Sequence, residues 1–399
     1  MSSDAEHIVI GAGISGLGLA HLAVRAGIPT LVLEEGERVG GCIDSRAFPA
    51  CGDFWAEGGA HTCFNSYGHL IDILRDLGLL SRITAKAKAS YSLWSAGRRR
   101  TIFSALHPLE LAVSLPKLFT QKKPGRSVAE YYGGGLGQRN YRDVFGPAFR
   151  AVICQNADDF PADLLFRRKP RRKEVLRSFT LPGGLSEIPK AMADQLGLSL
   201  RMATGVRRVR RDGDRFCVVT SGGEELRCRF LSLAVPPDVA AELIPAEMAE
   251  LRRVVGAIDM AETESLALAV PATEVGHLPP LAGLIAVDDA FYSMVSRDYL
   301  ADPRYRGFTF HFGPGALAPA TQVEHACRVL GIHEEQVAGI ARAVNRLPAL
   351  RAGHLERVSQ IDALLAGSSL ALTGNWFVGV SIEDCLSRSH QEFRRLFAG

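Results

Sequence analysis

Six residues near the N-terminus have the spacing that binds a dinucleotide through backbone atoms alone. Residues 11–16 read GAGISG, the pattern G-x-G-x-x-G. Gly11 permits a tight turn, Gly13 lets the backbone approach a pyrophosphate, and Gly16 lets a helix pack closely on a strand. Amides left unpaired at the start of that helix, with the helix dipole behind them, bind an anion without a cationic side chain. The predicted dinucleotide-binding residues of this turn are Gly11, Ala12, Gly13, Ile14, Ser15 and Gly16.

The elements that must position this turn can be predicted on both sides of it, which matters because the pattern arises by chance in a chain with 40 glycines. Residues 7–10 are a short apolar run typical of a strand, and residues 17–24 carry apolar side chains at helical spacing. A second predicted strand, residues 29–33, ends at Glu34, with Glu35 beside it. An acid at this place binds a free ribose 2′-hydroxyl and disfavours a 2′-phosphate. The pattern therefore predicts FAD or NAD in preference to NADP.

The stretch around Glu34 separates FAD from NAD. It reads LVLEEGERVGGCIDS and resembles the E-x-x-x-R-x-G-G-[RK] signature of the flavin amine oxidase and protoporphyrinogen oxidase superfamily. The resemblance implies that Glu34 binds the adenosine ribose of FAD, and that Arg38, Gly40 and Gly41 lie along the pyrophosphate and the flavin. A second glycine pair brings another backbone segment close to an extended cofactor, and an arginine can neutralise phosphate charge. The chain departs from the signature at Cys42, where the family carries a basic residue.

Two later segments resemble the same superfamily. Residues 178–235 match a segment that returns the chain to the FAD lobe, and Val206 corresponds to a family position whose backbone contacts adenine. The ending TGNWFVGVSIEDCL is similar to the G-N-x-x-x-G-[VI]-x-x-x-x-C-[IV] ending of protoporphyrinogen oxidase-like proteins, whereas amine oxidases usually carry Gly-Glu in place of Gly-Asn. A helix that starts there would stabilise the negative charge of a reduced flavin, although a helix that only packs on the sheet explains its apolar face equally well. The predicted flavin-binding residues of this ending are Gly374, Asn375, Gly379, Val380 and Ser381.

One histidine is the candidate for catalysis. Residues 57–61, EGGAH, align with a family turn that approaches the flavin, which adds Gly58, Gly59 and Ala60 to the predicted cofactor-binding residues. His61 is expected to orient substrate or bind a proton, since its unperturbed pKa is about 6.5. A structural histidine satisfied by its neighbours is the alternative interpretation. The eight cysteines lack paired CxxC spacing, so they are interpreted as reduced thiols and no metal site is predicted.

The predicted fold is α/β, with a Rossmann-like FAD-binding lobe of the GR2 type built from discontinuous segments and a second, mixed sheet-and-helix substrate lobe. Two lobes are also the default for a chain of 399 residues. By the resemblance, the FAD-binding segments are residues 1–75, 176–254 and 356–399. The substrate lobe takes residues 76–175 as its helical part and residues 255–355 as its sheet part.

Two stretches of the predicted substrate lobe leave alternatives open. Residues 167–177 hold seven cations in eleven residues, which suits a solvated loop, an anionic substrate, an acidic carrier protein or anionic lipid headgroups. Residues 102–106 and 109–119 are apolar and lie between basic residues at 98–100 and 122–123. They suit an interfacial helix, but a core helix of the substrate lobe is the preferred interpretation.

These features predict an FAD-dependent oxidoreductase that removes hydride from a C–N or C–C bond of a small organic substrate, anionic or hydrophobic, to flavin N5. O2 is the expected acceptor, and the FAD is expected to be non-covalent because no attachment motif is recognised. A non-redox mutase that uses reduced flavin, and a non-catalytic FAD-binding scaffold, are the alternatives. A net charge of +3 argues against a nucleic-acid partner. Without a signal sequence or a spanning apolar run, the expected location is cytoplasmic, with peripheral membrane attachment left open.

Overall fold

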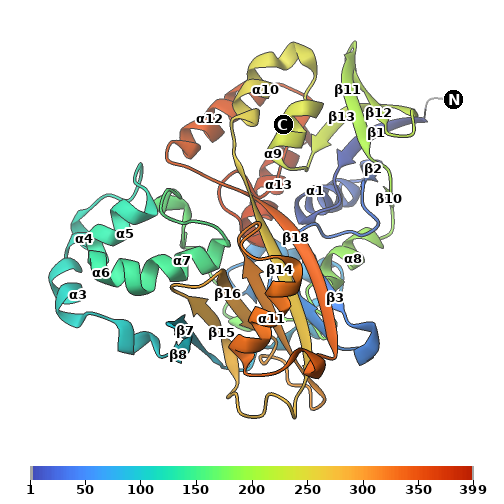
Figure 1. The fold of residues 1–399 in the computed structure, drawn as a ribbon. Coiled ribbons are helices and arrows are strands. Elements are labelled where there is room, and N and C mark those ends of the chain that lie inside the picture. Colours follow the sequence, from blue (N-terminus) through green and yellow to red (C-terminus); the bar gives the residue numbers. More distant parts are fainter. Residues whose placement is uncertain (1–2, 398–399) are drawn as a thin grey trace.

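The computed structural model describes residues 3–397, and its core is a seven-stranded sheet assembled from distant parts of the chain (Figure 1). The strand order is β10-β2-β1-β13-β12-β11, with β19 paired to β13. β10, β2, β1, β13 and β19 are parallel neighbours, whereas β12 and β11 continue the sheet in antiparallel fashion. The strands are β1 (Ser3–Ile10), β2 (Thr30–Leu33), β10 (Leu198–Arg201), β11 (Val206–Asp212), β12 (Arg215–Thr220), β13 (Glu225–Leu233) and β19 (Leu370–Leu372).

Helices cover both faces of this sheet, because its central strands are apolar on both sides. In β1, Ile8 and Ile10 belong to one apolar cluster while Val9 belongs to another. The Val9 side packs against α1 (Ile14–Arg25), α2 (Gly68–Asp76), α8 (Glu187–Ala193) and α13 (Ile382–Phe397). The opposite side packs against α9 (Pro237–Leu243), α10 (Ala249–Gly256) and α12 (His354–Leu365).

A second seven-stranded sheet has the order β18-β14-β17-β16-β15-β7-β8. α11 (Pro319–Leu330) packs on it through an apolar cluster rich in phenylalanine. The strands of this second sheet are β7 (Ser90–Ser95), β8 (Arg98–Arg100), β14 (Met260–Pro271), β15 (Leu281–Ala286), β16 (Phe291–Ser296), β17 (Tyr305–Phe312) and β18 (Gly339–Pro348). Smaller sheets pair β3 (Ser45–Ala47) with β4 (Trp55–Glu57), and β9 (Ser178–Thr180) with both β5 (Cys63–Phe64) and β6 (Thr84–Ala85).

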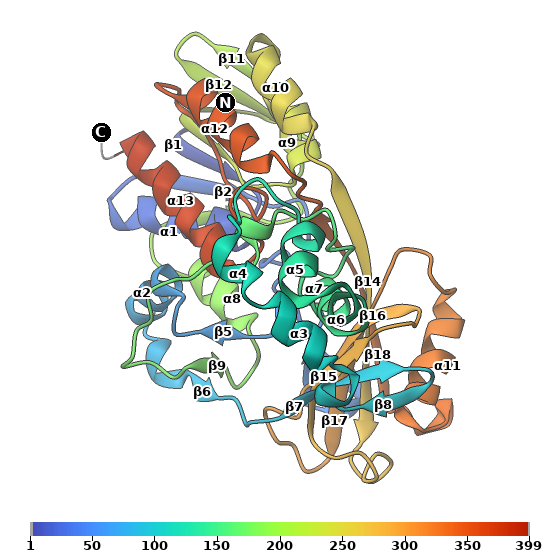
Figure 2. The same ribbon diagram turned by 90° about the vertical axis from the view of Figure 1, so that its left-hand side faces the viewer.

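A group of short helices lies on one side of the second sheet and away from the N-terminal sheet (Figures 1 and 2). Its members are α3 (Pro108–Ser114), α4 (Lys117–Thr120), α5 (Val128–Leu136), α6 (Gln138–Asn140), a π-helical turn (Tyr141–Phe145) and α7 (Gly146–Ile153). The preferred expectation of a single core helix over residues 109–119 is wrong. The stretch forms two short helices interrupted at Pro116, and Leu109, Val113 and Phe119 are 85%, 77% and 85% exposed.

The predicted α/β fold class, with a Rossmann-like unit beside a second mixed sheet, is confirmed. We propose the predicted segment boundaries as the boundaries of two lobes. The strand order supports them, because strands between residues 3 and 33, 198 and 233, and 370 and 372 join the first sheet, whereas strands between 90 and 100 and between 260 and 348 join the second.

Candidate functional site

The N-terminal glycine turn has a geometry that only glycine tolerates. Gly11 follows β1 at a φ of +101°, and a Cβ there would lie 2.6 Å from the carbonyl oxygen of Ala234. A Cβ on Gly16 would lie 2.0 Å from the carbonyl oxygen of Gly11. Among the described residues no side chain caps α1, whose N-cap is Gly13, and its first turn holds no acid. The start of α1 therefore presents free amides at the carboxyl ends of the parallel strands, as an anion site requires.

Glu34 stands at the end of β2 and faces this turn. Its carboxylate accepts hydrogen bonds from the amide of Ala12 at 2.7 Å and from the amide of Gly36 at 2.8 Å. Thr204, just before the predicted adenine contact Val206, donates its amide to the carbonyl of Glu34 at 2.7 Å. The acid and the Val206 segment are thus neighbours at one end of the turn, although they are far apart in the sequence.

The second glycine pair lies directly on the first turn. The amide of Gly40 donates to the carbonyl of Ala12 at 2.8 Å, and a Cβ on Gly41 would lie 3.3 Å from the Cα of Gly13. Arg38 closes this loop, since its guanidinium donates to the carbonyl of Gly41 at 2.7 Å and pairs with Asp44 at 3.6 Å. In the structure Arg38 therefore holds the loop in place, and its contact with phosphate stays a prediction.

A third segment, residues 58–60, follows the second. The amide of Gly58 donates to the carbonyl of Asp44 at 2.7 Å, and the amide of Ala60 donates to the carbonyl of Cys42 at 3.1 Å. A Cβ on Gly59 would lie 2.0 Å from the same Cys42 oxygen. The departure from the family signature at Cys42 is accommodated here because the position contributes its backbone to the packing.

The C-terminal segment reaches the same place through α13. Ser381 caps this helix with Asp384: the Ser381 amide donates to the Asp384 carboxylate at 3.3 Å, and the Asp384 amide donates to the Ser381 hydroxyl at 3.2 Å. α13 packs along α1, where Ser389 donates its hydroxyl to the carbonyl of Ser15 at 2.7 Å. The beginnings of two helices therefore lie side by side at the edge of the first sheet.

One cavity of about 180 Å³ connects these segments. Predicted residues that line it are Gly13, Ile14, Ser15, Gly40, Gly41, Ala60, Gly374, Asn375 and Val380. Predicted residues outside its lining are Gly11, Ala12, Gly16, Glu34, Glu35, Arg38, Gly58, Gly59, Val206, Gly379, Ser381 and His61. Ala234, Val235 and Pro236 also line the cavity and were not predicted, although they follow the carboxyl end of a parallel strand, which is where such folds bind ligands. Arg346 reaches the cavity from β18 of the second sheet and was not predicted, because no neighbouring sequence pattern indicates it.

His61, which is half-buried, pairs with the buried His311. Its Nε2 lies 2.9 Å from Nε2 of His311, and Nδ1 of His311 lies 3.0 Å from the hydroxyl of Ser265. Burial lowers the pKa of His61 well below its usual value and the pKa of His311 to about 4. Because both rings are neutral at pH 7, one of the facing nitrogens donates and the other accepts. The pair connects the turn at residues 58–61 to β17.

The half-buried ammonium of Lys86 and the buried carboxyl of Glu57 lie next to this pair. The ammonium of Lys86 donates to the carbonyl of His61 at 2.8 Å and lies 3.5 Å from the centre of the Tyr299 ring. Glu57 accepts from the amide of Leu185 and the hydroxyl of Ser45, both at 2.8 Å. Burial raises the pKa of Glu57 to about 7 and lowers the pKa of Lys86 to about 8. No spacing in the sequence could predict this cluster, because only folding brings residues 57, 86 and 311 together.

A larger cavity of about 690 Å³ adjoins the first along Val380. Its lining combines apolar side chains with part of the basic cluster. Its lining comprises Phe64, Ser66, Tyr67, Val152, Ile153, Phe160, Leu164, Leu165, Phe166, Arg167, Arg168, Lys169, Arg171, Val380, Ser381 and Asp384. Lys169 is neutralised by Asp384 at 2.7 Å, whereas Arg168 and Arg171 make no ion pair or hydrogen bond within residues 3–397. Two guanidinium groups therefore face this cavity without a protein anion.

Comparisons with known proteins agree with this geometry. A family profile described as NAD(P)-binding Rossmann-like domain matches residues 9–77, and one described as flavin containing amine oxidoreductase matches residues 134–273. A coproporphyrinogen III oxidase from Propionibacterium freudenreichii subsp. freudenreichii is 29% identical over 236 residues, which cover 52% of this chain and 42% of that protein. The chain spans about half the length of the curated relatives it matches.

Solved structures show the same fold over nearly the whole chain. A protein from Exiguobacterium sp. 255-15, assigned as a protoporphyrinogen oxidase, superposes with a TM-score of 0.79 at 16% identity over 99% of both chains. Reduced UDP-galactopyranose mutase superposes with a TM-score of 0.77 at 14% identity, over 99% of this chain and 96% of that one.

Fold and site together define a two-lobed protein of the Rossmann-like, flavin-containing class. The chain is similar to the flavin amine oxidase and protoporphyrinogen oxidase superfamily, as the sequence predicted, and the matching amine oxidoreductase profile is itself described as flavin containing. The residues present fit such a cofactor. The glycine turns at Gly13 and Gly41 keep side chains out of the cavity, and the uncapped start of α1 lines it. No helix within residues 3–397 is long and apolar enough to cross a membrane.

Proposed function

We propose that the chain is an FAD-dependent oxidoreductase that binds FAD without a covalent bond in the cavity between the glycine turns. One observation carries this proposal: glycine-bearing segments at residues 11–16, 40–41, 58–60 and 374–379 converge around the starts of α1 and α13. A dinucleotide needs close backbone approach at several points along its length, which this arrangement offers.

In this proposal, different groups of the chain bind different parts of the cofactor. Glu34 holds the adenosine ribose, with Glu35 and Val206 beside it, and the free amides of α1 hold the pyrophosphate. The start of α13 lies where the flavin ring system is expected, and its dipole favours negative charge there. When bound, FAD supplies the hydride acceptor at N5 and passes the electrons on, with O2 as the proposed acceptor.

The histidine pair and Lys86 are proposed to act at the substrate side of the flavin. Since His61 and His311 are neutral and share a hydrogen bond, His61 can accept a proton without first losing one. The nearby Lys86 ammonium opposes a lasting positive charge on His61, so a proton held there is released readily. His61 is therefore proposed to hold a proton transiently and to position substrate.

The cavity of about 690 Å³ is proposed to bind substrate. Its apolar side chains suit a hydrophobic body, and Arg168 and Arg171 suit a carboxylate or phosphate on the same molecule. We therefore interpret the basic cluster as a site for an anionic small organic substrate, in preference to a carrier protein or lipid headgroups. We also propose a cytoplasmic location, which the eight free cysteines support.

Anaerobic stopped-flow spectroscopy tests the proposal with FAD-loaded protein. Coproporphyrinogen III and a panel of primary amines are the first substrates to mix, because relatives carry those activities in their names. Bleaching of the flavin absorbance supports oxidation. A similar fold occurs in reduced UDP-galactopyranose mutase, so activity on a sugar nucleotide only after dithionite reduction would support a mutase instead. A flavin that no substrate bleaches and no dithionite activates would indicate a non-catalytic scaffold.

A further inference from the structure

A further cavity lies beside the basic segment at residues 167–172. Its volume is about 580 Å³, and its lining comes from residues 66–72, from this segment and from α13. We call it the outer cavity, and we call the cavity of about 690 Å³ the substrate cavity. The linings of both include Arg167, Arg168, Lys169 and Arg171, so the two cavities meet along the segment. One ligand can therefore occupy both.

The outer cavity is polar, whereas the substrate cavity is largely apolar. Among the described residues that line the outer cavity, only Pro170 and Val378 carry apolar side chains. The substrate cavity is lined by aromatic and aliphatic side chains such as Phe160, Leu164 and Phe166. Polar groups are costly to bury in apolar surroundings, so an amphipathic ligand would place its polar end in the outer cavity and its apolar body in the substrate cavity.

Three acids line the outer cavity, and each is already bound by the protein. Asp72 accepts two hydrogen bonds from the guanidinium of Arg172, at 2.8 and 2.9 Å. Glu383 accepts from two amides at the start of α2, at 3.0 and 3.3 Å. Asp384 pairs with the ammonium of Lys169 at 2.7 Å. No acid of the described lining is therefore left to neutralise a further cation.

Three guanidinium groups of the segment have no acidic partner within residues 3–397. Arg168 and Arg171 make no ion pair or hydrogen bond there, and Arg167 donates only to the carbonyl of Val378, at 3.2 Å. A guanidinium donates in a planar fork that matches the oxygens of a phosphate. Three cations within five residues also repel one another, so an anion bound between them relieves that repulsion.

The segment that carries these arginines is fixed at two points. The ammonium of Lys169 donates to the hydroxyl of Ser381 at 2.9 Å, and the amide of Arg172 donates to the carbonyl of Asn65 at 2.8 Å. Each of these anchors directly follows a free arginine in the sequence. The free arginines are therefore held near the cavity before a ligand arrives, which lowers the entropic cost of binding.

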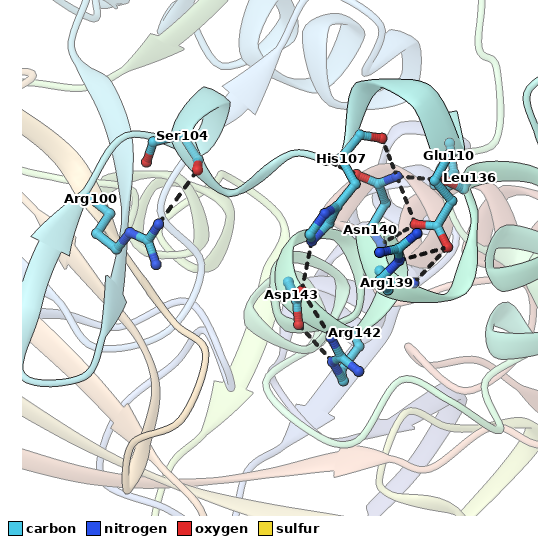
Figure 3. A network of polar contacts seen from close by, with 9 residues as sticks. All are labelled: Arg100, Ser104, His107, Glu110, Leu136, Arg139, Asn140, Arg142 and Asp143. Carbon is cyan, nitrogen blue, oxygen red and sulfur yellow. Dashed lines mark hydrogen bonds and ion pairs between the residues drawn. The ribbon is translucent and has the colours of Figure 1, made fainter. Parts of the chain in front are cut away.

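A hollow beside the helical group, also of about 580 Å³, shows how arginines are usually neutralised in this protein (Figure 3). Arg142 donates to Asp143 at 2.7 and 3.1 Å, and Arg139 lies 3.7 Å from Glu110. Of the arginines drawn there, Arg100 alone has no acid and donates to a backbone carbonyl at 3.4 Å. Three arginines without an acid within five residues therefore distinguish the outer cavity.

We propose that the outer cavity binds the diphosphate group of an amphipathic organic molecule whose apolar body lies in the substrate cavity. A diphosphate fits better than a single carboxylate, because it offers several charged oxygens to three guanidinium forks. The inference names the substrate class and rests on the proposed function where it places the body beside the flavin site. The diphosphate site itself depends only on Arg167, Arg168 and Arg171.

Isothermal titration calorimetry of the full-length, FAD-loaded protein with inorganic pyrophosphate tests this site. Bound FAD keeps the probe out of the glycine-lined cavity, and physiological ionic strength screens weak surface attraction. The wild type binds pyrophosphate. The double variant Arg168→Gln, Arg171→Gln loses at least about a hundredfold in affinity, since a hydrogen bond to a charged group is worth about tenfold or more. Arg142→Gln is the matched control and binds as the wild type does, because Arg142 is exposed and already paired with Asp143.

Geranyl diphosphate tests whether one ligand spans both cavities. It should bind at least about tenfold more tightly than pyrophosphate, because its chain leaves water for the substrate cavity. The double variant Val152→Ser, Phe166→Ser should lose most of this gain and keep the wild-type affinity for pyrophosphate. Val152 and Phe166 line the substrate cavity and are 55% and 57% exposed, so the variant should fold, which the melting temperature verifies.

Wild-type protein that does not bind pyrophosphate overturns the proposal, as does a double arginine variant of unchanged affinity. Citrate that binds as tightly as pyrophosphate would assign the arginines to a polycarboxylate and equally overturn it. Geranyl diphosphate that binds no more tightly than pyrophosphate would refute the amphipathic ligand. The flavin absorbance is read before each titration. Protein that takes up no FAD contradicts the proposed function, whereas FAD-loaded protein that does not bind pyrophosphate contradicts the diphosphate site alone.

Discussion

Replacing Gly16 by alanine should separate cofactor binding from folding. The added Cβ would lie 2.0 Å from the carbonyl oxygen of Gly11 and 3.0 Å from the Cβ of Ala234. Ordinary contact needs about 3.4 Å, so the start of α1 must move away from the sheet by roughly 1 Å or more. Overpacking of this kind costs about 1–3 kcal/mol, and the upper end applies because the obstacle is backbone and cannot rotate away. The same movement displaces the amides proposed to bind the pyrophosphate.

We therefore expect Gly16→Ala to lower the free energy of unfolding by about 3 kcal/mol and to weaken FAD binding at least about a hundredfold. Urea unfolding of the apoprotein measures the first quantity, and quenching of flavin fluorescence on titration measures the second. The control is Gly18→Ala in the same helix, where the Cβ would meet only the tip of the Leu386 side chain. That tip can rotate, and alanine gains about 1 kcal/mol of helix propensity, so stability and FAD affinity should stay near wild type. Equal FAD affinity of Gly16→Ala and wild type would refute the assignment of this turn.

Three further predictions follow from the buried groups. Glu57, whose pKa rises from 4.5 to about 7 on folding, keeps its proton longer in the folded state, so stability should fall by about 3 kcal/mol as pH rises from 4.5 to 7. Glu57→Gln should flatten that dependence in urea titrations across this range, and an unchanged slope would contradict it. His61→Ala should slow flavin reduction about a hundredfold and change its pH profile without loss of bound FAD; if rate and profile stay the same, His61 is structural. Arg388 is 2% exposed and forms ion pairs with Asp362 at 2.6 Å and Glu392 at 2.8 Å. Arg388→Met should therefore lower the free energy of unfolding by about 3 kcal/mol. A loss below about 1 kcal/mol would show that the ion pairs contribute little to stability.

The sequence was sufficient for the parts of the site that depend on backbone approach. The backbone turn requires glycine at positions such as Gly11 and Gly16. These positions are close together in the sequence, so their spacing can be recognised without the tertiary structure. The position of Glu34 after a short strand follows from the same βαβ unit. The ending around Gly374 could be predicted because its glycines and the cap of α13 also act locally.

Side chains that meet only through the tertiary fold could not be predicted. His311 lies on β17 of the second sheet, and its contact with His61 depends on how that sheet sits against residues 58–61. Arg346 reaches the cavity by the same route. The expectation of a core helix at residues 109–119 failed because apolar content does not say which side of a helix is inward. The contacts of Asn140 with His107 and Glu110, from a different helix, decide that orientation.

The glycine-bearing segments are proposed to bind one FAD together. The most direct measurement is gel filtration of the full-length protein after incubation with excess FAD, with the flavin absorbance and the protein absorbance read across the same peak, and with acid precipitation of the pooled peak. We expect one FAD per chain in the peak, and free flavin in the supernatant after acid. A peak without flavin would refute the proposed FAD site.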